Sequence, residues 1–124
     1  MYREKLTQYI DNKQSEMLKN LADFIQIPSI SENKNQVSEA LNYALNLGKS
    51  LGFKVSLVLD GQVGVIEMGG GQETLGILSH VDVVAPGDMD KWMTPLLRLL
   101  SNRAISMEEA PLMIRGPSLL LYMP

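Results

Sequence analysis

The chain has 124 residues with 45% hydrophobic and 20% charged side chains, a composition typical of one globular domain and not of a disordered or fibrous protein. Eleven Lys and Arg residues against fourteen Asp and Glu residues give a net charge of -3, which argues against a dedicated nucleic-acid binder. Cysteine is absent, so the chain offers no disulfide, thiolate nucleophile or cysteine-ligated zinc.

The start of the chain does not resemble a targeting segment, because Met1–Leu6 is followed by mixed polar residues rather than by an apolar run. The longest apolar runs are also far shorter than the ~20 residues that a membrane span needs. We therefore expect a cytoplasmic protein that has neither a membrane nor a nucleic acid as its partner.

Two amphipathic helices are predicted in the first half of the chain. Apolar residues recur at helical spacing over 2–25, and Pro28 disfavours helical geometry at the residue before it, so the first helix should end there. A second apolar stripe runs over 37–51, and either Asn33 or Asn35 can cap the start of its helix.

The apolar period changes to two after the second helix, which predicts strands. Alternating residues favour a strand over 53–59, Asp60-Gly61 is a strong hairpin-turn signal, and a second strand follows over 62–68. After a glycine-rich turn, the run 74–78 has the continuous apolar character of a strand that is buried on both faces of a sheet. The order of two helices, a hairpin and a buried strand predicts an α/β fold.

His80 is the only histidine in the chain, and it follows the most apolar predicted strand, where open α/β sheets tend to place ligand-binding residues. Asp82 comes two residues later and points to the same side in an extended segment, so its carboxylate can accept a ring N–H and orient the imidazole for a metal ion. On spacing alone, an ordinary polar pair on the surface is the commoner arrangement, and the metal-site interpretation needs further support.

Two other features have a structural interpretation that competes with a functional one. Gly69–Gly71 could be imagined as a phosphate cradle, but no Lys-Ser or Lys-Thr follows it, so a turn is favoured. Trp92 could line a substrate pocket with Pro95, yet a single tryptophan usually anchors a loop. The serines have no second histidine and no nucleophile-elbow motif, which argues against a serine hydrolase.

The run Leu75–Asp88, followed by Lys91–Pro95, resembles the first metal-binding motif of the co-catalytic zinc metallopeptidases. That family includes aminoacylase, carboxypeptidase G, succinyl-diaminopimelate desuccinylase and the bacterial dipeptidase V group. Leu21–Ser31 is similar to the family's N-terminal helix and its Ile-Pro-Ser exit. The hairpin around Asp60-Gly61 fits the dipeptidase V-like branch best, and the resemblance covers residues 1 to about 95.

The resemblance implies that residues 1–95 are the N-terminal part of an α/β/α catalytic domain that hydrolyses peptide or N-acyl amide bonds. His80 would ligate one Zn²⁺ of a pair, and Asp82 would serve the catalytic site by orienting its imidazole. A dipeptide or an N-acyl amino acid would be the substrate of the complete enzyme. The family's remaining ligands come later than the matching part, so we expect at most weak zinc binding and no activity from this chain alone.

After Pro95 the sequence departs abruptly from the family's pattern. With allowed codon choices, a shifted reading frame over 96–124 can restore the Pro-Phe-Glu and Tyr-Gly-Arg-Gly-x-x-Asp-Asp-Lys-Gly segments that the family carries there. A frameshift near Pro95-Leu96, natural or from sequencing, is therefore predicted, and 96–124 would be a poorly ordered tail. Its apolar run Leu119–Tyr122 would favour self-association.

Two functional hypotheses remain open from the sequence. In the first, the chain is the N-terminal fragment of a zinc-dependent dipeptidase or amidohydrolase, with a succinyl-diaminopimelate desuccinylase-like deacylase as the variant within the family. In the second, it is a non-catalytic α/β interaction module or remnant that has inherited His80 and Asp82.

Overall fold

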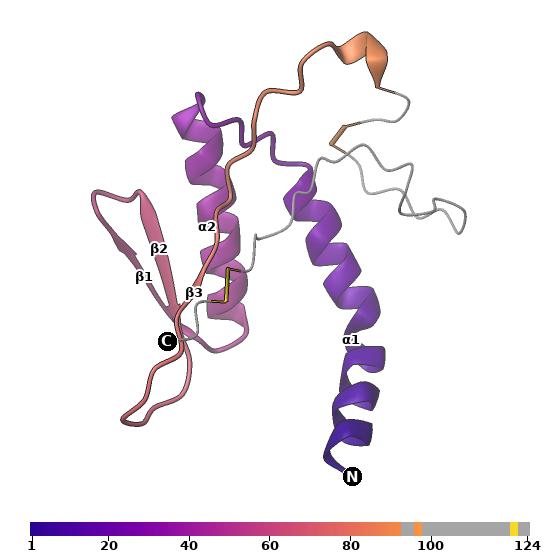
Figure 1. Ribbon diagram of the computed structural model, residues 1–124, viewed down its shortest axis with the longest axis vertical. Helices are drawn as coiled ribbons and strands as arrows, with labels where there is room; N and C mark the ends of the chain where they lie inside the picture. Colours follow the sequence, from indigo (N-terminus) through magenta and orange to yellow (C-terminus); the bar gives the residue numbers. More distant parts are fainter. Residues whose placement is uncertain (93–95, 98–119, 122–124) are drawn as a thin grey trace.

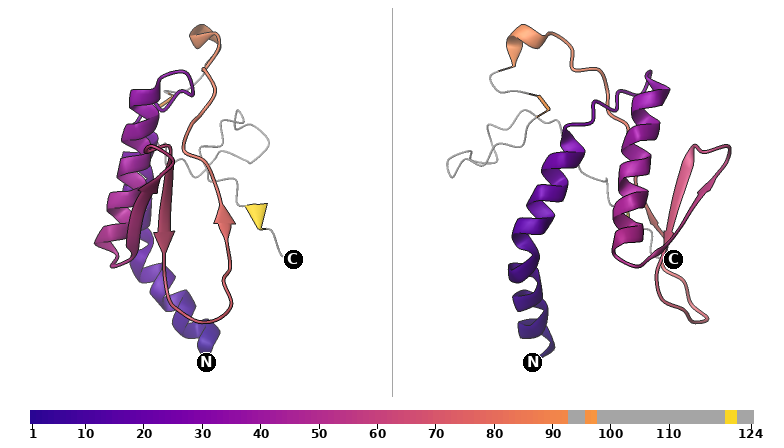
Figure 2. Two further views of the ribbon diagram at one scale, coloured as in Figure 1. Left: turned by 90° about the vertical axis from the view of Figure 1, so that its left-hand side faces the viewer. Right: turned by 180° about the vertical axis from the view of Figure 1, so that it is seen from behind.

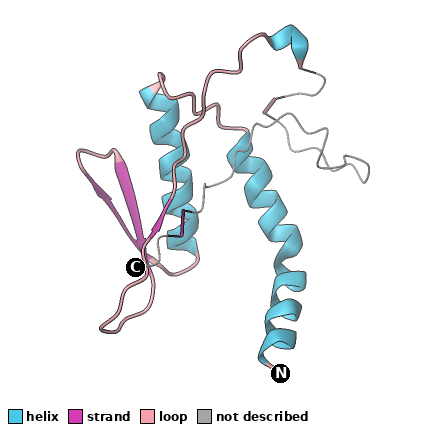
Figure 3. Ribbon diagram, in the orientation of Figure 1, coloured by secondary structure: helices cyan, strands magenta, loops and turns pink. Residues whose placement is uncertain are grey.

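The computed structural model of the protein describes residues 1–92, 96–97 and 120–121, and these form a mixed α/β fragment (Figures 1 and 3). The elements in chain order are helix α1 (Tyr2–Ile25), helix α2 (Lys34–Ser50), strands β1 (Lys54–Val58), β2 (Val63–Glu67) and β3 (Ile77–Leu78), the 3-10 helix η1 (Met89–Lys91) and strand β4 (Leu120–Leu121). The predicted order of two helices followed by a hairpin is confirmed.

Both helices have the boundaries that local sequence signals predict. α1 occupies the predicted range, and the chain leaves it at Gln26, two residues before Pro28. α2 begins after Asn33, whose side-chain Oδ1 accepts a hydrogen bond of 3.3 Å from the backbone N–H of Gln36. This bond satisfies one of the N–H groups that the first turn of a helix leaves without a partner.

The hairpin that follows α2 is antiparallel and regular. Its register runs from the pair Lys54↔Glu67 to the pair Val58↔Val63, which leaves residues 59–62 as the connecting loop. Asp60 and Gly61 adopt positive φ angles of 55° and 80° in this loop, as their turn signal predicts.

The core lies between α2 and the hairpin, which Figure 2 shows side by side in two orientations. Ala40 and Leu45 on α2 are 0% and 7% exposed. Gly64 on β2 allows the strand to approach the helix closely, because a Cβ atom there would lie 2.9 Å from the terminal carbons of Leu41 and Leu45. The absence of a side chain at this position therefore permits the close contact between the two elements.

Helix α1 is attached to this core near its C-terminal end. The ring of Phe24 stacks on that of Tyr43 with 5.7 Å between centroids, and the Tyr43 hydroxyl donates a 3.1 Å hydrogen bond to the carbonyl of Asn20. The N-terminal turns extend away from α2 (Figure 1), and no residue of the helix is buried. Its apolar stripe is half-exposed, at Leu6, Ile10, Met17, Leu18 and Leu21.

The prediction of a strand buried on both faces over 74–78 is wrong. The observed strand β3 has two residues, Ile77 and Leu78, and they are 56% and 76% exposed. A strand is buried on both faces only when neighbouring strands and covering helices surround it. Within the described residues, β3 pairs with β4 alone and is not part of the β1–β2 sheet.

The predicted poor order of the tail 96–124 falls almost wholly outside the described residues, which include only 96–97 and 120–121 of that range. Among the described helices, none combines the length and the hydrophobicity needed to cross a lipid bilayer.

Candidate functional site

Two short segments that lie far apart in the sequence run side by side at the exit of α1. Ile30 and Val83 form a parallel bridge. The backbone N–H of Ser31 donates to the carbonyl of Val83, and the N–H of Val83 donates to the carbonyl of Ser29, both at 2.9 Å. The Ser29 hydroxyl, which is 2% exposed, donates to the carbonyl of Val81 at 2.7 Å. We call this arrangement of residues 29–31 and 81–83 the paired segment.

The two residues that the sequence singles out contact each other, His80 just before the paired segment and Asp82 within it. Nδ1 of His80 lies 3.3 Å from Oδ1 of Asp82 and 2.9 Å from the Asp82 backbone carbonyl. Both oxygens are acceptors, so both contacts require a proton on Nδ1. In the neutral ring, the lone pair that could bind a metal is then on Nε2.

A third side chain completes the cluster. The Ser31 hydroxyl donates to Oδ2 of Asp82 at 2.7 Å and also lies 3.0 Å from the carbonyl of Val83. Each carboxylate oxygen of Asp82 therefore has its own partner. Ser31 was not predicted as a site residue, because its contact with Asp82 spans 51 positions and no local pattern reveals it.

The charged groups of the cluster are accessible to water, and their hydrogen bonds affect the pKa of Asp82. The hydrogen bond from Ser31 is the largest cause that lowers the pKa of Asp82 below its ordinary value; partial burial opposes it, while a backbone N–H and His80 add to it. The side chains of His80 and Asp82 are 57% and 43% exposed, so water screens the attraction between them.

The cluster fits one part of a metal site. A histidine whose Nδ1–H is held by a carboxylate is the usual form of a metal-ligating imidazole. A catalytic zinc ion ordinarily has three protein ligands. Within residues 1–92, 96–97 and 120–121, no three His, Asp or Glu side chains are grouped so that they could hold a metal ion. The described residues thus provide one suitable imidazole and not a complete ligand set.

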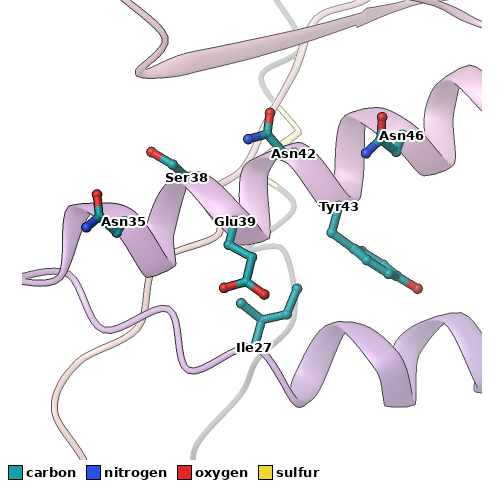
Figure 4. A pocket seen from close by; sticks show the side chains of 7 residues that line it. All are labelled: Ile27, Asn35, Ser38, Glu39, Asn42, Tyr43 and Asn46. Carbon is teal, nitrogen blue, oxygen red and sulfur yellow. The ribbon is translucent and has the colours of Figure 1, made fainter.

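Two surface grooves lie along α2 and at its start. One, of about 510 Å³, follows the polar side of α2 where it faces the end of α1 (Figure 4). Its lining includes the polar side chains of Asn35, Ser38, Glu39, Asn42 and Asn46. Another, of about 550 Å³, lies at the start of α2. Neither groove is lined by His80 or Asp82.

The other two candidates of the sequence have structural roles in the structure. Gly69 and Gly71 adopt φ angles of 79° and 153° in the connection between β2 and β3, which agrees with a turn. The Trp92 indole N–H donates a 2.9 Å hydrogen bond to the carbonyl of Pro86 and so fastens its own loop. Pro95 lies outside the described residues.

Several curated proteins are similar to the chain in sequence. A protein of Staphylococcus epidermidis named "Putative dipeptidase" is 34% identical over 132 residues, an alignment that covers 98% of this chain and 26% of the relative. A Bacillus subtilis protein with the same description is 34% identical over 85 residues, covering 61% of this chain and 18% of the relative. A third protein with this description, from Staphylococcus saprophyticus, is 34% identical over 97 residues, covering 71% of this chain and 20% of the relative.

The chain therefore spans about a quarter or less of the length of these relatives. No model of a protein family matches it, and no solved structure matches it.

Proposed function

We propose that the chain is part of a dipeptidase-like hydrolase whose complete form cleaves peptide substrates. The observation that carries this proposal is the 34% identity with a protein named "Putative dipeptidase" along 98% of the chain. The relatives' names favour a dipeptidase over the desuccinylase-like deacylase, because two further similar proteins carry the same description.

Within this proposal, His80 is one zinc ligand, and Asp82 orients it. The support is the Nδ1–Oδ1 distance of 3.3 Å, which places the carboxylate where it can hold the Nδ1 proton. A bound zinc ion supplies Lewis acidity and a water molecule of lowered pKa. In the family that the sequence resembles, the other ligands come from sequence beyond the part that residues 1–95 match, so the 124-residue chain should bind zinc weakly and lack peptidase activity.

A chimera tests the proposal. Residues 1–95 of this chain would replace the matching segment of the Staphylococcus epidermidis relative, and hydrolysis of a dipeptide panel would be measured with zinc present. We expect the chimera to cleave dipeptides, and we expect His80→Ala to reduce the rate by more than about 100-fold, because the loss of a ligand exceeds the usual effect of losing its orienting partner.

The matched control in the chimera is Lys54→Ala, which removes an exposed charge on the hairpin that pairs with Glu67. Its activity should remain close to that of the chimera itself. Equal activity of the His80→Ala and Lys54→Ala chimeras would contradict the ligand role of His80, and hydrolysis by the isolated 124-residue chain would contradict its proposed inactivity.

The frameshift has a separate test in the nucleotide sequence. If the reading frame is broken near Pro95-Leu96, the shifted frame should stay open for several hundred codons and encode the family's remaining Asp, Glu and His ligands. Stop codons soon after this point in the shifted frame would favour the alternative hypothesis, a non-catalytic module or remnant.

A further inference from the structure

We propose that Ser31 is a positioning residue of the His80 site: its hydroxyl holds Oδ2 of Asp82, so that Oδ1 faces the imidazole and keeps the proton of the neutral ring on Nδ1. The biological use of this arrangement rests on the proposed function, whereas the arrangement itself is a property of the free chain.

The first reason for this role is the geometry of the Asp82 carboxylate. A carboxylate is planar and rigid, so a partner that fixes one oxygen also fixes the direction of the other. Ser31 holds Oδ2 at 2.7 Å, and Oδ1 then lies 3.3 Å from Nδ1 of His80. Without the hydroxyl, rotation of the Asp82 side chain would carry Oδ1 away from the ring.

The second reason is the backbone pairing. The Ser31 side chain is exposed, so it can hold the Asp82 carboxylate in one position only if the backbone of Ser31 is itself fixed. The N–H of Ser31 is bonded to Val83, and the N–H of Val83 is bonded to Ser29, whose hydroxyl is buried against Val81. The paired segment therefore fixes the backbone on both sides of the contact between Ser31 and Asp82.

The third reason is the exposure of the His80 and Asp82 side chains to solvent. With 57% and 43% of their side chains exposed, His80 and Asp82 would form only a loose pair in water if nothing else restrained them. The nitrogen that carries the proton in a neutral imidazole is set by the hydrogen bond that the ring makes. The Asp82 backbone carbonyl, 2.9 Å from Nδ1, favours the tautomer whose Nε2 lone pair is suited to a metal ion, and a carboxylate held in place by Ser31 adds a second acceptor for the same proton.

The experiment measures this tautomer directly by nitrogen-15 NMR of the ring in the 124-residue chain, at a pH where the imidazole is neutral. His80 is the only histidine, so its two ring nitrogens are identified without ambiguity. We expect the Nδ1–H form to predominate in the unmodified chain. Ser31→Ala should lower the ratio of Nδ1–H to Nε2–H by about twofold or more, the effect of losing part of one hydrogen bond.

Two variants serve as matched controls. Ser31→Thr keeps a hydroxyl at the same position and should preserve the ratio. Ser50→Ala removes a hydroxyl that bonds to Leu47 within α2, and it should leave the ratio unchanged. Because Ser31 is exposed, its change to alanine opens no cavity in the core.

The outcomes distinguish Ser31 from its neighbours. If Ser31→Ala does not lower the ratio, the positioning role is wrong; if Asp82→Ala does not lower it either, the backbone carbonyl of Asp82 is what holds the proton on Nδ1. The positioning role is also wrong if Ser31→Thr behaves like Ser31→Ala, or if Ser31→Ala abolishes the protection of the Val83 amide from hydrogen exchange, since the backbone pairing would then be responsible. The measurement uses neither metal nor peptide, so failure here leaves the dipeptidase proposal standing, and an inactive chimera leaves the tautomer result standing.

Discussion

At the scale of single residues, Asp82 divides its two carboxylate oxygens between a neighbour in sequence and a residue 51 positions away. The contact with His80 could be predicted, because alternate residues of an extended segment point to the same side. The contact with Ser31 could not, because it depends on how the exit of α1 packs. The metal-binding role of His80 stays a prediction.

The hydrogen bond from Ser31 has a consequence for acid titration. We expect Ser31→Ala to raise the pKa of Asp82 toward its ordinary value, since that bond is the largest cause of the lowered pKa. A lowered pKa means that the Asp82 carboxylate stabilises the fold above the ordinary pKa of the group, and that this stabilisation is lost as the pH falls through the lowered value. The effect on stability should be small, because the side chain is 43% exposed.

Carbon-13 NMR of the Asp82 carboxyl group, followed from neutral to acidic pH, measures this change. Ser50→Ala provides the control, because its hydroxyl bonds to Leu47 and does not contact Asp82. Equal Asp82 titration curves in the unmodified chain and the Ser31→Ala variant would show that the serine does not stabilise the carboxylate.

At the scale of the elements, both helices and the hairpin could be predicted because their signals are local: an apolar period, a capping asparagine and an Asp-Gly turn. The burial of the strand predicted over 74–78 could not be judged from the sequence, because burial of a strand depends on what surrounds it. The same apolar run that predicted a buried strand gives β3, whose Leu78 is 76% exposed.

The cap of α2 can be tested by substitution. Asn33→Ala removes the side-chain oxygen that accepts from Gln36, and we expect a loss of about 0.5–2 kcal/mol in the free energy of unfolding. Asn35→Ala makes the same chemical change two residues later, inside the first turn, where alanine is the better helix former. Urea unfolding followed by circular dichroism measures both, and a loss as large for Asn35→Ala would contradict the assignment of the cap.

The close approach of β2 to α2 predicts a second effect at this scale. Gly64→Ala would place a Cβ atom 2.9 Å from carbons of Leu41 and Leu45, and because Leu45 is buried we expect a destabilisation of about 1–3 kcal/mol. Gly76→Ala is the control, since among the described residues no atom beyond its chain neighbours lies within 4 Å of the Cβ that it would add. Thermal unfolding should give a lower midpoint temperature for Gly64→Ala than for Gly76→Ala. Equal midpoint temperatures would show that the helix and strand can move apart without a cost in stability.

At the scale of the whole molecule, the apolar side chains are buried to very different extents in different elements. The core between α2 and the hairpin buries Ala40 and Leu45, whereas α1 buries no residue and β3 is exposed. Amphipathicity predicted both helices equally well, yet it could not reveal which apolar stripe would be covered, because covering depends on the arrangement of elements.

This uneven burial predicts opposite results for two leucines. Leu45→Ala should lower the free energy of unfolding by at least about 2 kcal/mol, because it leaves a cavity in the core. Leu6→Ala should change it by less than about 0.5 kcal/mol, because Leu6 is 49% exposed. Chemical unfolding of both variants measures the difference, and similar losses would mean that α1 is packed against the body of the protein in solution.

The paired segment also bears on the order in which the chain folds. Its contacts join positions 52 residues apart, and the intervening sequence contains all of α2 and the hairpin, whose own contacts are local. Closing so long a loop has a larger entropic cost than forming a helix or a hairpin, so we expect it to follow them. The histidine and its acidic neighbour would then reach their final orientation late, after the hydrophobic centre has formed, and a chain slowed at that stage would be folded in its core while its polar cluster was still unassembled.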